Sequence, residues 1–430
     1  MQYRRGWIAL LLFSMTLINY IDRATLSFAI DPISQELGLS TVARGYLFSS
    51  FLWTYTLCLI PMGWLVDRYG AKSIAGIGVG VWSIATALTG LAPTFAIMLA
   101  CRLLMGSGEA STNPSGAKVI REWIPAGERG ALSAFFNSGA YAGPALCALA
   151  AGPIISHFGW PALFYIMGAL GLIWVFVWTS VFKRPEDASW LKAEERLVIL
   201  TQRTGGTQAG SQPAGGLRQL LRGPTLWGLA FAMGCNVYSQ YLFLTWLPSY
   251  LRSTKGLNLS SSGVYTALPY AVAVVLCIVI GLVSDRLLRN RDVSRGGRRN
   301  LIACTMALAS IILLAPLINN LPLLTCLFAL SMTGVAATAS QTHALTNDLL
   351  KNPRDVGVAI SFVIVGGNVF GMLAPIVTGY VIEATGSYSW AFIIAGSLLV
   401  LGAASILGVT RQPIGMGWYK NTNTVAARAQ

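Results

Sequence analysis

Apolar stretches of about twenty residues recur along almost the whole chain, and they restrict the fold more than any other feature of the sequence. Hydrophobic residues make up 54% of the 430 residues and charged residues only 11%, against about 25% charged in a typical soluble domain. A bilayer core about 30 Å thick takes roughly 20 apolar helical residues per crossing. Backbone polar groups inside lipid must be satisfied within the protein, and the stretches lack the alternation of barrel strands. We therefore predict an all-α membrane protein.

The apolar stretches divide into twelve predicted transmembrane helices in two six-helix halves. We expect the spans at roughly 7–30, 43–66, 74–91, 95–118, 131–156, 160–182, 224–251, 262–284, 300–318, 321–347, 356–382 and 388–410. The domains are then an N-terminal half (1–182), a cytoplasmic linker (183–222), a C-terminal half (223–410) and a cytoplasmic tail (411–430). The linker is the one long interruption, and it is rich in charged residues, Gly and Pro.

Lysine and arginine are distributed unevenly between the two sides of the predicted membrane. On one side lie 25 of the 30 basic residues, whereas only Arg44, Arg252 and Lys255 lie on the other. Because basic loops stay in the cytoplasm, we place both termini there. The net charge of +14 comes from these loops, without a basic stripe interleaved with aromatic residues, so we expect no nucleic-acid partner.

A short repeat relates the two halves. Residues 63–68 (GWLVDR) follow the second predicted span and residues 281–286 (GLVSDR) follow the eighth, and each leads into a basic loop. The first copy, continued by YGAK to residue 72, resembles the signature loop of the major facilitator superfamily. The resemblance covers the whole chain and implies the major facilitator fold. It also implies that Gly63, Asp67 and Arg68 act as a conformational latch between the halves.

Four charged residues fall deep inside predicted spans: Asp22, Arg23, Arg102 and Glu109. Each costs about 2.5–3.5 kcal/mol at the bilayer centre on the insertion scale, so we expect them to pair or to face water. From the helical rise per residue, Asp22, Arg23 and Arg102 share one level, and Glu109 lies about 10 Å nearer the cytoplasm. If the two helices face each other, Asp22 can pair with Arg102.

These residue types suit the transport of an acid. A guanidinium group binds a carboxylate through two hydrogen bonds, and a buried carboxyl group can carry a proton. Burial favours the protonated carboxyl group, whereas a neighbouring arginine favours the ionised form, so a substrate that competes for the arginine would couple its binding to proton uptake. The alternative is a buried salt-bridge network that only fixes helix packing, although such ion pairs are weak stabilisers.

The segments that hold these residues, 19–27 (NYIDRATLS) and 102–110 (RLLMGSGEA), resemble the anion:cation symporter family. That family includes bacterial transporters of D-galactonate, glucarate and hexuronates. The resemblance implies proton coupling by Asp22 and Glu109 and anion binding by Arg23 and Arg102.

Polar residues in other spans complete the expected substrate site. They are Tyr55, Asn137, Tyr238, Gln240 and Asn368. For any one of them, an interhelical hydrogen bond is an equal alternative to contact with the ligand. Tyr55 and Asn368 match positions that line the cavity in the galactonate-type relatives, which favours them as ligand contacts.

The sequence therefore predicts a secondary active transporter. We expect a proton-coupled symporter that imports a small organic anion, a sugar acid such as an aldonate, aldarate or uronate, as a monomer in a bacterial inner membrane. The alternatives are a carrier of another monocarboxylate or of an aromatic or sulfonated acid, and an exporter or uniporter of the same fold. We expect neither an enzyme nor a cofactor or metal, because the sequence shows no metal cluster, phosphate loop or nucleophile with its base, and the seven cysteines lack paired spacing.

Overall fold

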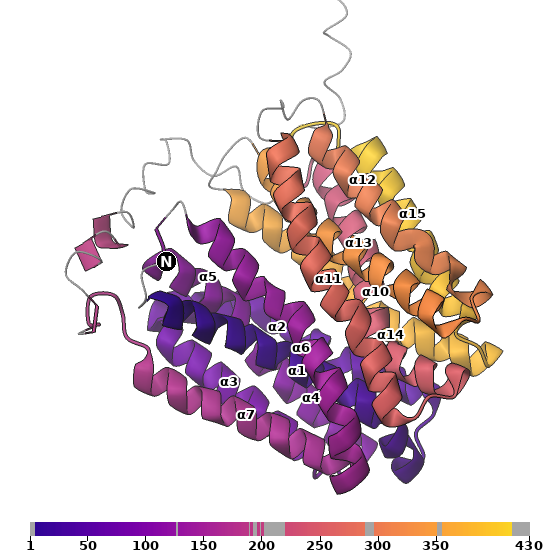
Figure 1. Ribbon diagram of the computed structural model, residues 1–430. Coiled ribbons are helices and arrows are strands. Elements are labelled where there is room, and N and C mark those ends of the chain that lie inside the picture. Colours follow the sequence, from indigo (N-terminus) through magenta and orange to yellow (C-terminus); the bar gives the residue numbers. More distant parts are fainter. Residues whose placement is uncertain are drawn as a thin grey trace, which may run out of the picture. The chain divides into compact units, whose positions relative to one another are not determined.

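The structure is a computed structural model that describes residues 5–125, 128–188, 190–191, 196–197, 199–201, 220–288, 296–350 and 355–414. Within these ranges all the regular elements are helices (Figure 1). Ten described helical segments are long and apolar enough to cross a bilayer. Most of the predicted linker (183–222) and of the predicted tail (411–430) lies outside the described residues.

The helices occur in the order that the apolar stretches predict. The earlier ones are α1 (Arg5–Leu37), α2 (Thr41–Tyr69), α3 (Ala71–Thr89), α4 (Phe95–Glu109), α5 (Thr112–Trp123), α6 (Arg129–Phe158) and α7 (Trp160–Val181). The later ones are α10 (Pro224–Lys255), α11 (Leu259–Leu288), α12 (Gly297–Ala309), the 3₁₀ helix η3 (Ser310–Leu317), α13 (Leu321–Asp348), α14 (Val356–Thr385) and α15 (Ser389–Val409).

Local sequence sets several helix ends. The side chains of Ser40 and Asn320 accept hydrogen bonds from backbone N–H groups three residues later, at 3.1 and 3.0 Å, and so cap α2 and α13. The turn between α6 and α7 passes through Gly159 at φ 79°, a conformation that suits glycine.

One predicted span, 95–118, is two helices in the structure. Helix α4 ends at Glu109 and α5 begins at Thr112. At the break, the Ser111 hydroxyl donates to the carbonyl oxygen of Gly108 at 2.8 Å, a local bond that competes with regular helical bonding. The break places Glu109 at a helix end inside the protein.

The span predicted at 300–318 is also irregular. It is α-helical to Ala309 and continues as η3, which contains Pro316. Since proline cannot donate a backbone hydrogen bond, regular α-helical bonding is interrupted there.

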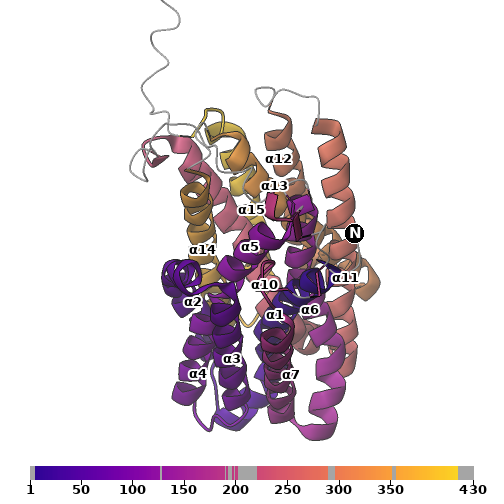
Figure 2. The ribbon, with the colours of Figure 1, turned by 90° about the vertical axis from the view of Figure 1, so that its left-hand side faces the viewer.

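The chain forms two compact units. Unit 1 comprises Met1–Gln208, Phe243–Ala271 and Pro375–Gly386, and unit 2 comprises Ala209–Leu242, Val272–Ala374 and Ser387–Gln430. In unit 1, α1 packs on α6, α3 on α4 and α7, and α2 on α4, as the two ribbon views show (Figures 1 and 2). In unit 2, α12 packs on α13 and α15, and the hydroxyl groups of Thr305 and Thr338 lie 2.8 Å apart between α12 and α13.

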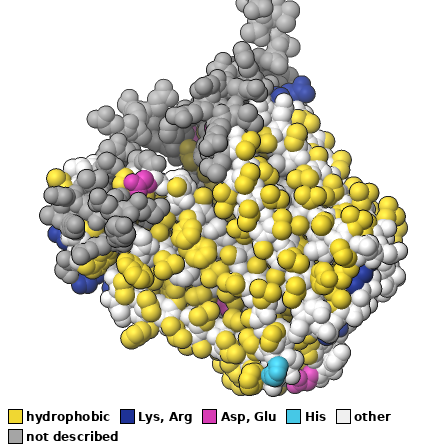
Figure 3. All heavy atoms as spheres, in the orientation of Figure 1, with side chains coloured by type: hydrophobic (Ala, Val, Ile, Leu, Met, Phe, Trp, Pro, Cys, Tyr) yellow, Lys and Arg dark blue, Asp and Glu magenta, His cyan; other side chains and the backbone are white. Residues whose placement is uncertain are grey.

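Hydrophobic side chains remain on the outside of the helices. Leu57, Ile60 and Phe176 are each more than 70% exposed. Figure 3 shows hydrophobic side chains spread over the described part of the face in view, with few charged ones among them. An apolar exterior of this kind matches a lipid environment.

Candidate functional site

A buried ion pair joins two helices inside unit 1. Arg23 of α1 donates through Nε to Oε2 of Glu109, the last residue of α4, at 2.7 Å. The side chains are 5% and 0% exposed. A charge-assisted hydrogen bond in such a dry environment is strong, and loss of either partner would leave the other as an unpaired buried charge.

The observed pair differs from the one expected from helix levels, which was Asp22 with Arg102. Asp22 is 1% exposed, and its two carboxyl oxygens accept no hydrogen bond from the described residues. Arg102, 2% exposed, directs Nη1 toward the sulfur of Met105 at 3.1 Å. The level calculation compared backbone heights, and it placed Glu109 about 10 Å below Arg23. It took residue 30 as the outer end of the first span, whereas α1 continues to Leu37. Arg23 and Glu109 therefore each lie 14 residues, about 21 Å, from the outer ends of α1 and α4, and they share a level.

Aromatic rings surround the two guanidinium groups. The Cζ atom of Arg23 lies 4.6 Å from the ring centroid of Tyr20, 5.1 Å from that of Phe51 and 5.0 Å from that of Tyr55. The Cζ atom of Arg102 lies 5.0 Å from the Phe51 centroid. Ring faces attract cations, so these rings help to hold the buried arginines. Sequence reasoning missed Tyr20 and Phe51, because an aromatic residue in an apolar span has the same pattern as a packing residue.

The hydroxyl group of Tyr55 is held from the other side of the helix break. Asn113, near the start of α5, donates through Nδ2 to this oxygen at 2.9 Å. Tyr55 itself is 5% exposed. Asn113 is thus a further polar residue at the cluster, and sequence reasoning did not identify it. Tyr55 contacts Asn113 through its hydroxyl group and Arg23 through its ring, so it links the α4–α5 break to Arg23.

Asn137 lies on α6. It is exposed, and its Nδ2 donates to the carbonyl oxygen of Ser133 at 2.8 Å. Asn137 precedes Ala148 by three helical turns and so shares its face. At Ala148 that face meets Gly263 of α11.

The candidate residues of unit 2 differ in accessibility. Tyr238 and Asn368 are 3% and 8% exposed, whereas Gln240 is partly exposed. Tyr238 and Gln240 are two residues apart on α10, about 200° around the helix, so they point to different sides of it. Asn236, fully buried, has an amide group whose two polar atoms find no partner among the described residues.

The signature loop is held by a lysine from α5. Lys118 Nζ donates to the backbone oxygens of Val66 and Asp67 at 2.7 and 3.1 Å and lies 3.6 Å from Asp67 Oδ1. Asp67 is 84% exposed. The Arg68 guanidinium lies over the rings of Trp64 and Tyr69, and a Cβ atom at Gly63 would meet no neighbour. The side chains of the second copy, Asp285 and Arg286, lie outside the described residues.

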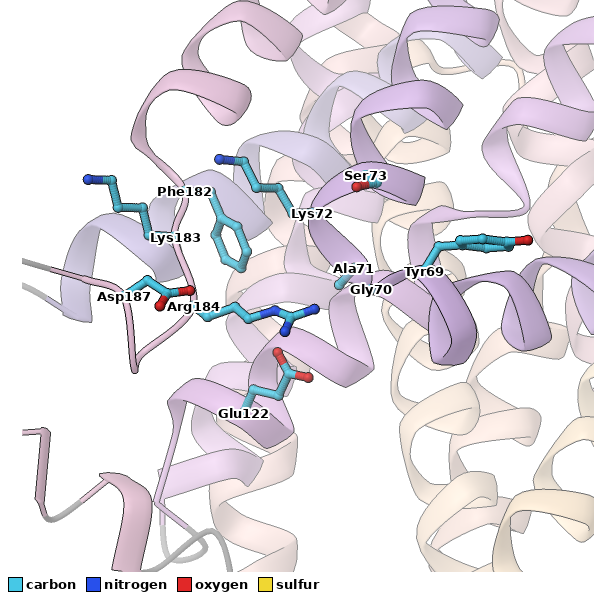
Figure 4. Close-up of a pocket in the computed structure, with 10 residues that line it drawn as sticks. All are labelled: Tyr69, Gly70, Ala71, Lys72, Ser73, Glu122, Phe182, Lys183, Arg184 and Asp187. Atoms are coloured by element: carbon cyan, nitrogen blue, oxygen red, sulfur yellow. The ribbon is translucent and has the colours of Figure 1, made fainter.

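A polar cavity of about 250 Å³ lies beside this loop (Figure 4). Its lining is Tyr69, Gly70, Ala71, Lys72, Ser73, Glu122, Phe182, Lys183, Arg184 and Asp187. The guanidinium group of Arg184 points toward the carboxyl group of Glu122. The lining includes none of the four charged residues that the sequence singles out, Asp22, Arg23, Arg102 and Glu109. The described residues contain no group of three His, Cys, Asp or Glu side chains that could hold a metal ion.

Comparison with solved structures identifies the fold. A bacterial homologue of the human lysosomal transporter Spinster, in an inward-facing and occupied conformation, matches with a TM-score of 0.73 at 18% identity, over 96% of this chain and 98% of the other. The same homologue in an inward-facing and unoccupied conformation matches with a TM-score of 0.75 at 19% identity, over 98% and 100%.

Comparison with curated proteins finds transporters of similar length. "Probable galactarate/D-glucarate transporter GudP" of Bacillus subtilis (strain 168) is 30% identical over 94% of this chain and 91% of its own. "Probable sulfoacetate transporter SauU" of Cupriavidus necator is 32% identical over 91% of each chain. "Probable L-galactonate transporter" of Escherichia coli (strain K12) is 30% identical over 94% of this chain and 89% of its own.

The profile of the Major Facilitator Superfamily matches residues 12–295 and 291–417. Together these matches cover nearly the whole chain and agree with the helical fold and the apolar exterior. The chain is therefore a multi-pass membrane transporter, not an enzyme, and it belongs to the major facilitator superfamily.

Proposed function

We propose that this chain is a proton-coupled symporter that imports a small organic anion, a sugar acid in the first place. The observation that carries the proposal is the buried Arg23–Glu109 ion pair, which lies in the same unit as Arg102 and Asp22. Arg23 is permanently charged and can bind an acid, and Glu109, which holds it, can bind a proton. The pair therefore offers the substrate and the proton one shared site inside an apolar protein.

The pair gives a direct route to coupling. While Glu109 is ionised, it holds Arg23. Once Glu109 is protonated, Arg23 is released to bind the carboxylate of the substrate. Proton and anion then favour each other's binding, and because linkage is reciprocal, the affinity for the anion rises as the pH falls. Asp22 precedes Arg23 in the sequence and is also buried, and we propose it as a second proton carrier.

The relatives support an acid with several hydroxyl groups. Two of them are named for galactarate, D-glucarate or L-galactonate, and one is named for sulfoacetate. Carboxylate and sulfonate groups are both anions, and each presents two oxygen atoms that a guanidinium group can bind through two hydrogen bonds. We propose that the rest of the substrate, including its hydroxyl groups, is bound by polar side chains: Tyr55, Asn137, Tyr238, Gln240 and Asn368. A sulfonated acid is the second candidate, favoured by the 32% identity to the sulfoacetate relative.

The topology is part of the proposal. We propose twelve spans, two homologous halves and cytoplasmic termini in a bacterial inner membrane, with the chain acting as a monomer. The uneven distribution of basic residues supports the orientation. In the same scheme Gly63, Asp67 and Arg68 form the cytoplasmic latch, and the contact of Lys118 with Asp67 supports it.

Calorimetry on the purified protein tests the proposed linkage. Binding of D-glucarate and D-galactonate is measured in two buffers that have the same pH but different ionisation enthalpies. The proposal predicts uptake of up to about one proton per bound anion and tighter binding at lower pH. Binding without any proton uptake, at every pH tested, would favour a uniporter instead.

A further inference from the structure

At the end of unit 1 that is remote from the signature loop, one carboxylate joins three segments. Oδ1 of Asp31, in α1, accepts hydrogen bonds from Arg44 Nη1 of α2 at 3.0 Å and from Ser249 Oγ of α10 at 3.1 Å. Its Oδ2 accepts from Arg252 Nη1 of α10 at 2.9 Å. The α10 donors follow Asp31 by 218 and 221 residues, so the contact closes a very long loop of chain.

The cluster is partly withdrawn from solvent. The side chains of Asp31, Arg44 and Arg252 are 18%, 24% and 27% exposed. Screening by salt is therefore weaker than for a fully exposed ion pair, and three donors on one carboxylate form a network and not an isolated pair. Arg44 and Arg252 are also two of only three basic residues on the predicted outer side, and both turn to the same carboxylate.

The same end of unit 1 is closely packed. Helix α14 approaches α2 so closely that a Cβ atom at Gly45 would lie 2.6 Å from the carbonyl oxygen of Pro375. Glu383 of α14 accepts a hydrogen bond from the backbone N–H of Val42 at 3.0 Å. Helix α11 approaches α6 in the same way at Gly152 and Ser260. Parts of α10, α11 and α14 thus belong to one compact unit with α1–α7.

We propose that Asp31 is an outer latch, a carboxylate that fastens α10 to α1 while this end of the transporter is closed. In the proposed opening, α10 moves away from α1, which breaks the bonds from Ser249 and Arg252 to Asp31. Arg44 lies only 13 residues from Asp31, on the adjacent helix, and stays with it. The carboxylate therefore keeps a cation in both states, and opening leaves no unpaired buried anion. The latch concerns the opening of one end and is independent of which anion is carried.

Two variants that remove one guanidinium group each from the same carboxylate separate a latch from a general stabilising contact. Backbone hydrogen exchange is measured by mass spectrometry on the full chain in lipid nanodiscs without substrate. Arg252→Met should raise exchange about three- to tenfold in peptides from 243–271 and 375–386, because local opening frees those amides. Arg44→Met should leave these peptides within about twofold of the wild type. Arg298→Met, which breaks the Arg298–Asp348 pair of unit 2, serves as the distant control.

A double-mutant cycle distinguishes loss of the Asp31–Arg252 contact from a general loss of stability. Asp31→Asn should increase exchange in the same peptides, and Asp31→Asn with Arg252→Met should add nothing beyond the larger single effect. Unchanged exchange in Arg252→Met, an equal increase in Arg44→Met, or additive effects in the double variant would each overturn the latch. Since no substrate or proton gradient is present, these results do not depend on the proposed transport reaction.

Discussion

Glu109 accepts the Arg23 hydrogen bond through one carboxyl oxygen, and a glutamine can accept the same bond through its amide oxygen. Glutamine cannot, however, take up and release a proton. We expect Glu109→Gln to retain exchange of external for internal substrate and to lose proton-driven accumulation. The measurement compares counterflow with concentrative uptake in proteoliposomes, with Glu122→Gln at the polar cavity as a control. Normal concentrative uptake by Glu109→Gln would refute the proposed role of Glu109.

Arg102 is almost fully buried, and its guanidinium group lies over Phe51. Its removal deletes a buried cation that the substrate acid would neutralise. We expect Arg102→Ala to abolish the rise in unfolding temperature that a bound sugar acid causes, and Arg102→Lys to restore only part of it, because an ammonium group lacks the planar two-point geometry. Thermal-shift titrations give the result, with exposed Arg121→Ala of α5 as the matched control. A full ligand response in Arg102→Ala would exclude Arg102 from the site.

At the scale of helices, the break between α4 and α5 depends on close packing with α3. A Cβ atom at Gly78 of α3 would overlap Ser111 Oγ and lie 2.9 Å from the carbonyl oxygen of Gly108. We expect Gly78→Ala to destabilise the protein by about 1–3 kcal/mol, because α3 must shift to make room. Gly80→Ala, two residues later in α3, meets open space and should stabilise by about 0.5–1 kcal/mol through helix propensity.

Thermal unfolding of the purified variants in one detergent measures both effects. Equal unfolding temperatures for Gly78→Ala and Gly80→Ala would show that the α3 contact does not hold the helix break.

The positions of several helices were predictable from the length of the apolar runs. The predicted span at 160–182 is α7 (Trp160–Val181), and that at 356–382 lies inside α14 (Val356–Thr385). Each contains an apolar run of about 20 residues, which is the length that a helix needs to cross the hydrocarbon core of a bilayer. The interruption at Ala110 was not predictable, since it depends on a serine hydroxyl and on glycine contacts with a neighbouring helix, neither of which changes the hydropathy.

The four buried charged residues of the candidate site were conspicuous in the sequence, but their contacts were not. A charge inside a span is conspicuous in the sequence because it is costly there, and this marked all four residues. The choice of Glu109 as the partner of Arg23 depends on the outer end of α1, which lies seven residues beyond the predicted span, and on the rings of Tyr20, Phe51 and Tyr55. Aromatic residues are common in apolar spans, so their sequence pattern does not separate ring contacts with arginine from ordinary packing.

At the scale of the whole molecule, orientation in the membrane follows from the basic loops. We expect trypsin to cut the linker at Arg203 or Arg218 in inside-out vesicles and to leave it intact in right-side-out vesicles, because the positive-inside rule places 183–222 in the cytoplasm. Gel electrophoresis detects two fragments of about half the chain length. Cleavage of the linker from the outside would reverse the proposed topology.

Proton-driven accumulation is the central property of the proposed transporter. Proteoliposomes that contain the purified chain are given labelled D-glucarate or D-galactonate from outside, with an inward proton gradient, without a gradient, or with a gradient and a protonophore. The Arg23–Glu109 site predicts that the acid accumulates above its external concentration only while the gradient lasts, and that the protonophore abolishes accumulation. Equilibration to the external concentration, at the same rate with and without the gradient, would contradict proton-coupled symport.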